Sequence, residues 1–288
     1  MNLPKEILIV GLGLMGGSYA SALSKKGYTV NAITIDQSSI DFAKEKGWIN
    51  YGTTELDSSL IGNADLVIFA LYPHVFVDWI TNNQQLLKSG AIITDVTGVK
   101  GSIVNKVQSI LRQDVEFIAA HPMAGREAYG VENSDDSVFH GANYIVVPTE
   151  KNSDKAIEMC KCLGNELGFS NITTLSADEH DSMIAFLSQL THCIAVSLMC
   201  ACDKQGLEQY TGDSFRDLTR IARINDEMWS ELFLENRKFL LNEMDNFKNS
   251  FDKLYNTIKN SNRDKMREMM RLSTERRERF NKRNEATK

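Results

Sequence analysis

Short, nearly continuous apolar runs alternate with amphipathic segments in the first part of the chain. Such runs are typical of buried strands, and the segments between them repeat their apolar residues at helical spacing. Because this alternation predicts a mostly parallel sheet covered on both faces, we expect residues 1–175 to form an α/β domain. The expected strands are Ile7–Val10, Thr29–Ile35, Leu66–Ala70, Ala91–Asp95, Glu116–Ala119, Tyr144–Val147 and Ile172–Leu175, and the expected helices cover 14–26, 38–46, 74–87, 99–111 and 153–167.

The pattern changes after Leu175, where only helical periodicity remains. Ser176 and Glu179 form a capping-box pattern that predicts the start of a helix. A long helix over 176–204 should follow, and residues 176–288 should form an all-α domain that supplies dimer contacts. The stripe that marks this helix consists of Ile184, Leu187, Thr191, Ile194 and Leu198.

Composition and charge narrow the function classes. The chain has 288 residues, 42% of them hydrophobic, and a net charge of −6, which is ordinary for a soluble protein and argues against nucleic-acid binding. The basic segment 262–288 interleaves both signs and repeats Met266, Met269 and Leu272 at helical spacing, so it predicts a solvated amphipathic helix. An anionic substrate would therefore need specific arginines.

The cysteine content and the N-terminal sequence indicate the cellular compartment of the protein. The five cysteines include two C-x-C pairs, a spacing that on a helix separates the thiols, so we expect reduced thiols and no metal site. The N-terminus enters a strand without a signal-peptide pattern, and no apolar segment is expected to reach the ~18 residues of a membrane span. We expect a cytoplasmic protein without a membrane partner.

A glycine-rich turn predicts a dinucleotide site. Gly11-x-Gly13-x-x-Gly16 follows a strand and opens a helix, and Asp36 lies 20 residues after Gly16 at the end of the second strand. Asp36 would accept hydrogen bonds from a ribose, and Gln37–Ser39 offer no arginine for a 2′-phosphate, so NAD is favoured over NADP. The candidate cofactor-binding residues are Gly11, Gly13, Leu14, Met15, Gly16, Asp36, Ala70 and Leu71.

Three later groups of residues could carry chemistry. His121 is expected at the tip of a strand that Pro122 ends, with Glu127 nearby; Ser188 and His192 are four apart on one helix face; and Arg216, Arg220 and Arg223 recur on another face beside Asp217. Taken singly, each has an ordinary explanation, because helical histidines are usually packed residues and arginines near aspartates are usually surface ion pairs.

Together with the glycine-rich turn, these groups resemble the prephenate dehydrogenase family, which includes arogenate dehydrogenases. The resemblance rests on GLGLMGGS at 11–18, DVTGVKG at 95–101, HPMAGRE at 121–127, LSQLTH at 187–192 and FRDLTRIA at 215–222, followed by Trp229. It implies a Rossmann-like NAD-binding domain, an all-α dimerisation domain and a homodimer. It also implies oxidative decarboxylation of prephenate to 4-hydroxyphenylpyruvate in tyrosine biosynthesis.

The resemblance assigns roles to single residues. His121 would accept the hydrogen bond of the substrate hydroxyl, Arg220 would bind a carboxylate, and His192 and Ser188 would contact the substrate. Glu127 and Asp217 would pair with the arginine and shape access to the site. In the family motif D-x-x-S-x-K the serine hydroxyl helps to orient the histidine and the nicotinamide, but here Gly98 takes the place of that serine. Either Thr97 substitutes for it, as a catalytic candidate beside His121, or this supporting contact is lost. The helical motif S-H-L-P-H is likewise replaced by residues 188–192, Ser-Gln-Leu-Thr-His.

Three alternatives remain open. The substrate could be arogenate, because nothing in the sequence identifies a partner for its ammonium group. A β-hydroxyacid dehydrogenase would have the same two-domain plan, but it would carry a catalytic lysine within a K-x-x-x-N helix motif that the middle of 176–204 lacks. A non-catalytic NAD-binding sensor would bind nucleotide without turnover, and it would tolerate His121→Asn.

Overall fold

The chain forms two compact units. The computed structural model describes residues 2–125 and 128–280, and the first unit ends at Arg237 while the second begins at Lys238. The functional boundary between 175 and 176 stays a prediction, because it lies inside the first unit.

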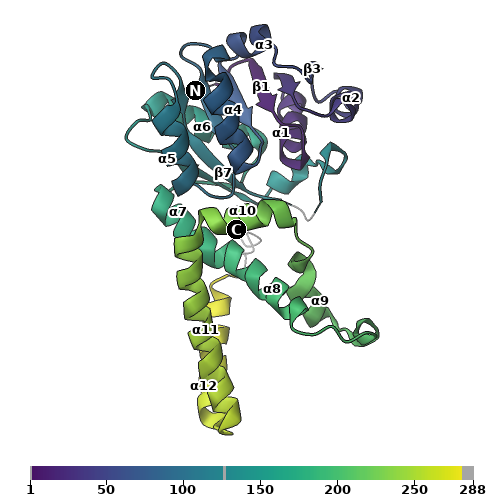
Figure 1. Ribbon diagram of the computed structural model, residues 1–288, viewed down its shortest axis with the longest axis vertical. Helices are drawn as coiled ribbons and strands as arrows, with labels where there is room; N and C mark the ends of the chain where they lie inside the picture. Colours follow the sequence, from purple (N-terminus) through teal and green to yellow (C-terminus); the bar gives the residue numbers. More distant parts are fainter. Residues whose placement is uncertain (1, 126–127, 281–288) are drawn as a thin grey trace, which may run out of the picture. The chain divides into compact units, whose positions relative to one another are not determined.

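The first unit contains a six-stranded parallel sheet with helices on both faces (Figure 1). Its strand order is β3-β2-β1-β4-β5-β6, the Rossmann arrangement, which confirms the predicted fold class. One face packs against α1, α2 and α6, and the other against α3, α4 and α5. The bounds are β1 Glu6–Val10, β2 Thr29–Ile33, β3 Tyr51–Thr53, β4 Leu66–Phe69, β5 Ile92–Asp95, β6 Glu116–Phe117, α1 Leu14–Lys25, α2 Gln37–Glu45, α3 Ser58–Asn63, α4 Pro73–Asn83, α5 Gly101–Ile110 and α6 Asp154–Leu167.

A second, three-stranded sheet carries His121. It consists of β7 Ala119–Met123, β8 Asn143–Val147 and β9 Asn171–Thr174, with β7 antiparallel to β8. The predicted end of the strand at His121 was wrong, because β7 continues through Pro122 to Met123. Pro122 is tolerated because β7 is the edge strand, where one side of the backbone needs no ladder partner.

The other differences in this part of the chain concern short elements. Strand β2 ends at Ile33 rather than Ile35, whose side chain is 97% exposed. The short β3 and α3 were not predicted, because a few residues give too little periodicity to recognise. Short 3₁₀ turns follow α4 at Gln84–Leu86 and follow β7 at Val131–Asn133 and Asp136–Phe139.

Helices alone follow β9 among the described residues. The helix α7, Ala177–Ile184, begins with the predicted capping box between Ser176 and Glu179. The expected single helix over 176–204 is instead α7, a π-helical turn at Ala185–Gln189, and α8 at Leu190–Cys200. The unit continues with a 3₁₀ turn at Leu207–Tyr210, α9 Asp213–Thr219, another 3₁₀ turn at Arg220–Ala222 and α10 Asp226–Glu235.

The segment Ala177–Cys200 corrects the expectation about apolar segments. Its mean hydropathy reaches 1.7 over a window in which 28% of the residues are buried, so by length and composition it could cross a membrane. The expectation was wrong because Ser, Gln, Thr and His break up the run of apolar residues, although residues 182–202 contain no charged side chain. One such helix is weak evidence for a membrane span, because helices at a core or an interface have the same composition.

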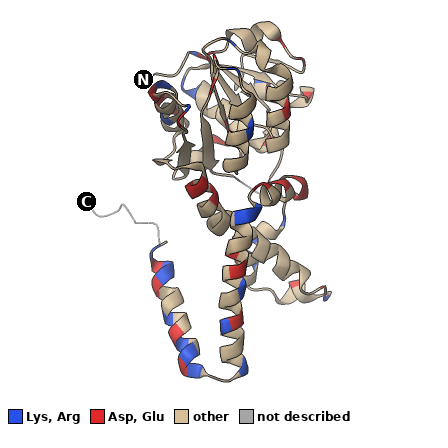
Figure 2. Cartoon of the chain, turned by 60° about the vertical axis from the view of Figure 1, so that its left-hand side comes forward, with Lys and Arg blue, Asp and Glu red and all other residues tan. Residues whose placement is uncertain are grey.

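The second unit is helical. The helix α11 spans Arg237–Lys259, and α12, Arg263–Glu278, follows after a turn in which Ser261 adopts a φ of 51°. Figure 2 shows Lys and Arg interleaved with Asp and Glu along α12. The predicted amphipathic helix in the basic segment is thus confirmed for its described part, which ends at residue 280.

Candidate active site

The glycine-rich turn lies where the strand order of the large sheet reverses, between β1 and β4. At Gly11 the φ is +98°, and a Cβ would lie 2.4 Å from the carbonyl oxygen of Ala70. At Gly16 a Cβ would lie 1.9 Å from the carbonyl oxygen of Gly11. The two glycines are therefore required by the close approach of β1, α1 and the residues after β4.

Space for a phosphate remains at Gly13. A Cβ on this residue would meet no atom within 4 Å, and Gly13 directly precedes α1 without any side-chain cap. The first amides of a helix have no intrahelical acceptor, so those of Leu14 and Met15 offer donors and a positive dipole end to an anion. Ala70 and Leu71 lie beside this turn, which brings seven of the predicted cofactor-binding residues together.

Asp36 caps the helix α2. Its carboxylate accepts hydrogen bonds from the amides of Ser38 and Ser39, both at 3.1 Å, and from their hydroxyls. The serine hydroxyls are the main cause that lowers the pKa of the exposed Asp36. The carboxylate is therefore an ionised acceptor at the end of β2, and ribose hydroxyls would compete with those of the serines.

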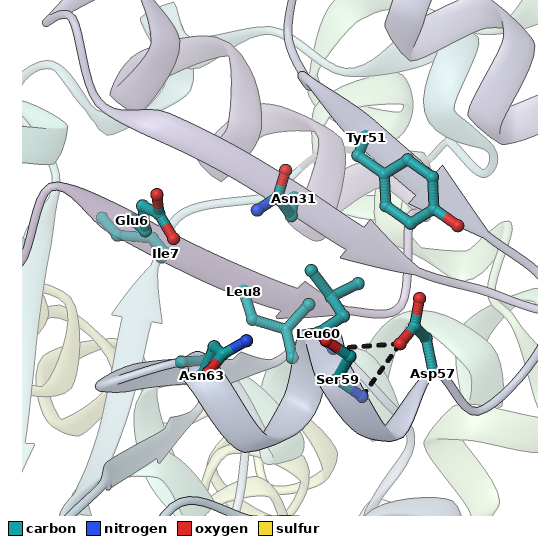
Figure 3. A pocket seen from close by; sticks show the side chains of 10 residues that line it. Glu6, Ile7, Leu8, Asn31, Tyr51, Asp57, Ser59, Leu60 and Asn63 are labelled. Atoms are coloured by element: carbon teal, nitrogen blue, oxygen red, sulfur yellow. Dashed lines mark hydrogen bonds between the residues drawn. The ribbon is translucent and has the colours of Figure 1, made fainter.

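A cavity of about 240 Å³ is lined by residues of β1, β2, β3 and α3 (Figure 3). It is lined by Glu6, Asn31, Tyr51 and Asp57 among others, and Asp57 is engaged in capping α3 through Ser59 and Leu60. Glu6 opens β1, whereas the glycine-rich turn follows its other end. None of the predicted site residues lines this cavity.

His121 is held by a second histidine. Its Nδ1 lies 2.8 Å from Nε2 of His180, whose own Nδ1 lies 2.7 Å from Oδ1 of Asp181. The other ring nitrogen of His121, Nε2, would lie 3.9 Å from a Cβ on Gly98 in the loop after β5. Burial is the main cause that lowers the pKa of His121 well below 6.5, and His180 and Lys100 act in the same direction. The imidazole is therefore neutral at neutral pH and suited to accept a proton.

A buried ion pair lies under the same loop. Nζ of Lys100 lies 2.6 Å from Oδ2 of Asp95, and neither side chain is exposed. The hydroxyl of Thr97 donates to the same carboxylate and accepts from Lys100 at 3.1 Å. Oδ1 of Asp95 accepts from the amide of Ala120 at 3.1 Å, which ties β5 to the residue before His121. The hydroxyl of Thr97 also lies 3.0 Å from the carbonyl oxygen of Val99, so Thr97 is held within this loop.

His192 and Ser188 are brought together across the π-helical turn. Nδ1 of His192 lies 2.9 Å from the carbonyl oxygen of Ser188, which can only accept, so this nitrogen carries the proton. The imidazole stacks on the indole of Trp229 with ring centroids 3.7 Å apart. π-helical turns are frequent at functional sites, and here the carbonyl of Ser188 and the indole of Trp229 together orient the His192 ring.

The arginines do not share one helical face as predicted. The helix α9 ends at Thr219, so Arg216 lies within it, Arg220 opens a 3₁₀ turn and Arg223 follows that turn. The 3₁₀ turn of Arg220 packs against α8, which carries His192. Asp217 is exposed on α9, and the predicted partner Glu127 lies outside the described residues.

His180 and Asp181 were missed by the sequence reasoning. Both are buried, and both belong to the first turns of α7. A signal existed, because His180 lies four residues before Ile184 and thus on the apolar stripe of the helix. Within residues 2–125 and 128–280, no group of three or more His, Cys, Asp or Glu side chains could hold a metal ion.

The fold and this site define a nucleotide-binding oxidoreductase in which a parallel sheet is followed by helices. Two family models match the chain: "Prephenate dehydrogenase, nucleotide-binding domain" over residues 19–173 and "Prephenate dehydrogenase, dimerization domain" over residues 176–272. The chain belongs to the prephenate dehydrogenase family.

Individual relatives agree with this assignment. The chain is 31% identical to a prephenate dehydrogenase of Lactococcus lactis, over 87% of this chain and 70% of that protein. It is 28% identical to a cyclohexadienyl dehydrogenase of Zymomonas mobilis, over 95% of both proteins. Among solved structures, prephenate dehydrogenase from A. aeolicus in complex with hydroxyphenyl propionate and NAD+ has a TM-score of 0.87 and 29% identity, over 98% of this chain and 99% of that one.

Proposed function

We propose that the protein catalyses the NAD-dependent oxidative decarboxylation of prephenate to 4-hydroxyphenylpyruvate, a step of tyrosine biosynthesis. The observation that carries this proposal is the neutral imidazole of His121, whose Nε2 is directed to the loop after β5. In the large sheet, β5 is separated from the glycine-rich turn after β1 only by β4. A base at this edge would face the reacting end of a bound dinucleotide.

The reaction needs a base, a hydride acceptor and cations. Prephenate has a 4-hydroxyl, a ring carboxylate and a pyruvyl side chain on a cyclohexadiene. Nε2 of His121 would accept the hydroxyl proton, and the electron pair of that O–H bond would form a ketone as the C4 hydrogen leaves as hydride, for which a bound NAD would be the acceptor. Loss of CO₂ would then make the ring aromatic, and its oxygen would take the proton back from His121 to give the phenol, which makes the step effectively irreversible.

NAD is the proposed cofactor. The relative from A. aeolicus was solved with NAD+, and Asp36 offers an ionised acceptor to the ribose hydroxyls. A 2′-phosphate would meet this carboxylate, and residues 37–39 supply no arginine to bind it. The helix α1 would bind the pyrophosphate through the amides after Gly13.

The substrate-binding roles rest on the helical part of the first unit. Arg220 is proposed to bind a carboxylate, because a guanidinium forms two parallel hydrogen bonds to it. His192 and Ser188 are proposed to contact the pyruvyl side chain, supported by the fixed orientation of the His192 ring against Trp229. Asp217 and Glu127 are proposed to pair with the arginine, and Thr97 to support the catalytic loop through Lys100.

A cytoplasmic homodimer is proposed for the assembly. The family match to a dimerization domain supports it, as do the exposed apolar side chains Phe186, Leu187, Leu198 and Met199 on the helical run 177–200. Exposed apolar side chains of this size are stabilised when a second copy of the chain covers them. All five cysteines are thiols rather than disulfides, which is what a reducing compartment favours.

Initial-rate assays with two substrates and two cofactors test the proposal. We expect reduction of NAD with prephenate, release of CO₂ and much slower reduction of NADP. Turnover with arogenate alone would assign the same chemistry to the amino acid substrate. Reduction with neither substrate would contradict the enzymatic proposal and leave nucleotide sensing as the function to examine.

A further inference from the structure

A chain of three side chains leads from the candidate site into the protein. Nδ1 of His121 contacts Nε2 of His180 at 2.8 Å, and Nδ1 of His180 contacts Oδ1 of Asp181 at 2.7 Å. His180 is fully buried and Asp181 nearly so. Neither residue belongs to the glycine-rich turn or to the segment that carries Arg216 and Arg220.

The direction of each hydrogen bond follows from the anchor at Asp181. Its Oδ1 accepts from the amide of Lys100 and its Oδ2 from the amide of Gly101, both at 2.8 Å. Both oxygens thus act as acceptors, and Nδ1 of His180 is the donor to Oδ1. Burial lowers the pKa of His180, which favours the neutral ring.

The remaining assignments are then forced. A neutral His180 that donates from Nδ1 has a lone pair on Nε2, so it accepts from Nδ1–H of His121. A neutral His121 with its proton on Nδ1 has its own lone pair on Nε2. That nitrogen is directed to the loop of Gly98, at the proposed place of the substrate hydroxyl.

We propose that His180 is a positioning residue that holds His121 in the Nδ1–H tautomer, with Asp181 fixing the tautomer of His180 in turn. This proposal rests on the proposed function, because only a proton-accepting His121 needs its lone pair on Nε2. His180 would also orient the His121 ring in place of the serine hydroxyl that Gly98 lacks. The ring is oriented through Nδ1, on the side away from the substrate.

The same chain stabilises the charge that the reaction creates. When the hydroxyl proton moves to Nε2, His121 becomes an imidazolium, and its bond from Nδ1–H to His180 becomes charge-assisted. Asp181, one hydrogen bond further on, carries the compensating negative charge. In this step no proton has to leave the three hydrogen-bonded side chains, and a bound nicotinamide would still be the acceptor of the hydride.

A purely structural role makes different predictions. Asp181 accepts from the amides of Lys100 and Gly101 at the start of α5, so the His–Asp pair could simply join α5 to α7. In that case a substitution of His180 would lower stability and affect binding and turnover together. As a positioning residue, His180 touches neither substrate nor cofactor, so its loss should lower kcat and leave both KM values little changed.

Two substitutions of His180 separate these roles. His180→Phe keeps a ring of similar size and removes the acceptor, and we expect kcat to fall by about 10²- to 10⁴-fold, the contribution of a positioned general base. His180→Gln places an amide oxygen near the former Nε2 and should recover most of the loss. His140→Gln changes an exposed histidine that is not part of the His121–His180–Asp181 series, and we expect it to leave kcat unchanged.

The tautomer is measured without any substrate. The chain has five histidines, so ¹⁵N-histidine NMR spectra of the full-length protein at pH 8 can be assigned by single substitutions. We expect His121 to carry its proton on Nδ1 in the unchanged protein, and to lose that preference in His180→Phe. A proton on Nε2 of His121 in the unchanged protein would overturn the proposal, even if the Phe variant does not fold.

The kinetic outcome is equally decisive for an active enzyme. Unchanged kcat in His180→Phe, or no recovery in a folded His180→Gln, would contradict the positioning role. If the unchanged protein oxidises neither prephenate nor arogenate, the proposed function fails, while the NMR spectrum still reports on the hydrogen-bond chain. The two failures are therefore distinguishable.

Discussion

Replacing Lys100 with methionine removes the cation from a buried ion pair. Its Nζ lies 2.6 Å from Asp95, and neither side chain is exposed to solvent. Methionine fills a similar volume, so the main change is a carboxylate left buried without its counter-ion. We expect a large loss of stability, because a buried charge without a partner is strongly unfavourable.

The size of the loss follows from what Asp95 retains. Removing one partner of a buried ion pair destabilises a protein by about 3–5 kcal/mol. Asp95 keeps the amide of Ala120 and both the amide and the hydroxyl of Thr97 as donors. We therefore expect the lower end, about 3 kcal/mol. At about 2 °C per kcal/mol for a chain of this length, the Tm should fall by about 6 °C.

Thermal unfolding of Lys100→Met and Lys106→Met provides the matched assay. Lys106 pairs with Glu235 at a similar distance, 2.8 Å, but the two side chains are 49% and 24% exposed. Such a pair contributes about 0–1 kcal/mol, so the Tm of Lys106→Met should fall by no more than about 2 °C. Equal shifts in the two variants would refute the reasoning that burial determines the effect.

Four further predictions concern the residues of the proposed site. Arg220→Ala should raise the KM for prephenate about 10- to 100-fold in initial-rate assays, because a hydrogen-bonded charge is lost; an unchanged KM would exclude the carboxylate role. Gly13→Ala should raise the KM for NAD and spare the Tm, whereas Gly16→Ala should lower the Tm, because its Cβ would meet the carbonyl oxygen of Gly11 at 1.9 Å. The pKa of His121 lies well below 6.5, so a pH profile of kcat/KM should stay flat through pH 6.5. The unfolded chain binds a proton there and the folded protein does not, so urea titrations should show stability falling as the pH drops below about 6.5.

The large sheet and its glycine-rich turn could be predicted because their signals are local. Strand, turn and helix are contiguous at residues 7–25, and the spacing to Asp36 lies within the same βαβ unit. The close approach of Ala70 to Gly11 could not be derived, because it depends on β4 pairing with β1. The sequence predicted which glycines are needed, and the strand order supplies the reason.

The course of β7 could not be predicted, because the rule used for Pro122 depends on the neighbours of the strand. Proline interrupts a central strand, but among the described residues β7 pairs with β8 alone. A single sequence does not reveal which strands are edges. The prediction that the three arginines share one helix face was wrong for a related reason. The helical periodicity of the sequence continues through Arg220, but the backbone hydrogen bonding changes there to a 3₁₀ turn.

His121 and His180 are 59 residues apart, so no spacing rule links them. Under the proposed positioning role, their contact supports the His121 ring without any hydroxyl at position 98. A serine there would place its hydroxyl near Nε2 of His121, since its Cβ would lie 3.9 Å away, and Nε2 is the atom proposed to accept the substrate proton. Support through Nδ1 does not compete with the substrate. If His180 orients His121 as proposed, the ring keeps its Nδ1–H tautomer with a glycine at residue 98.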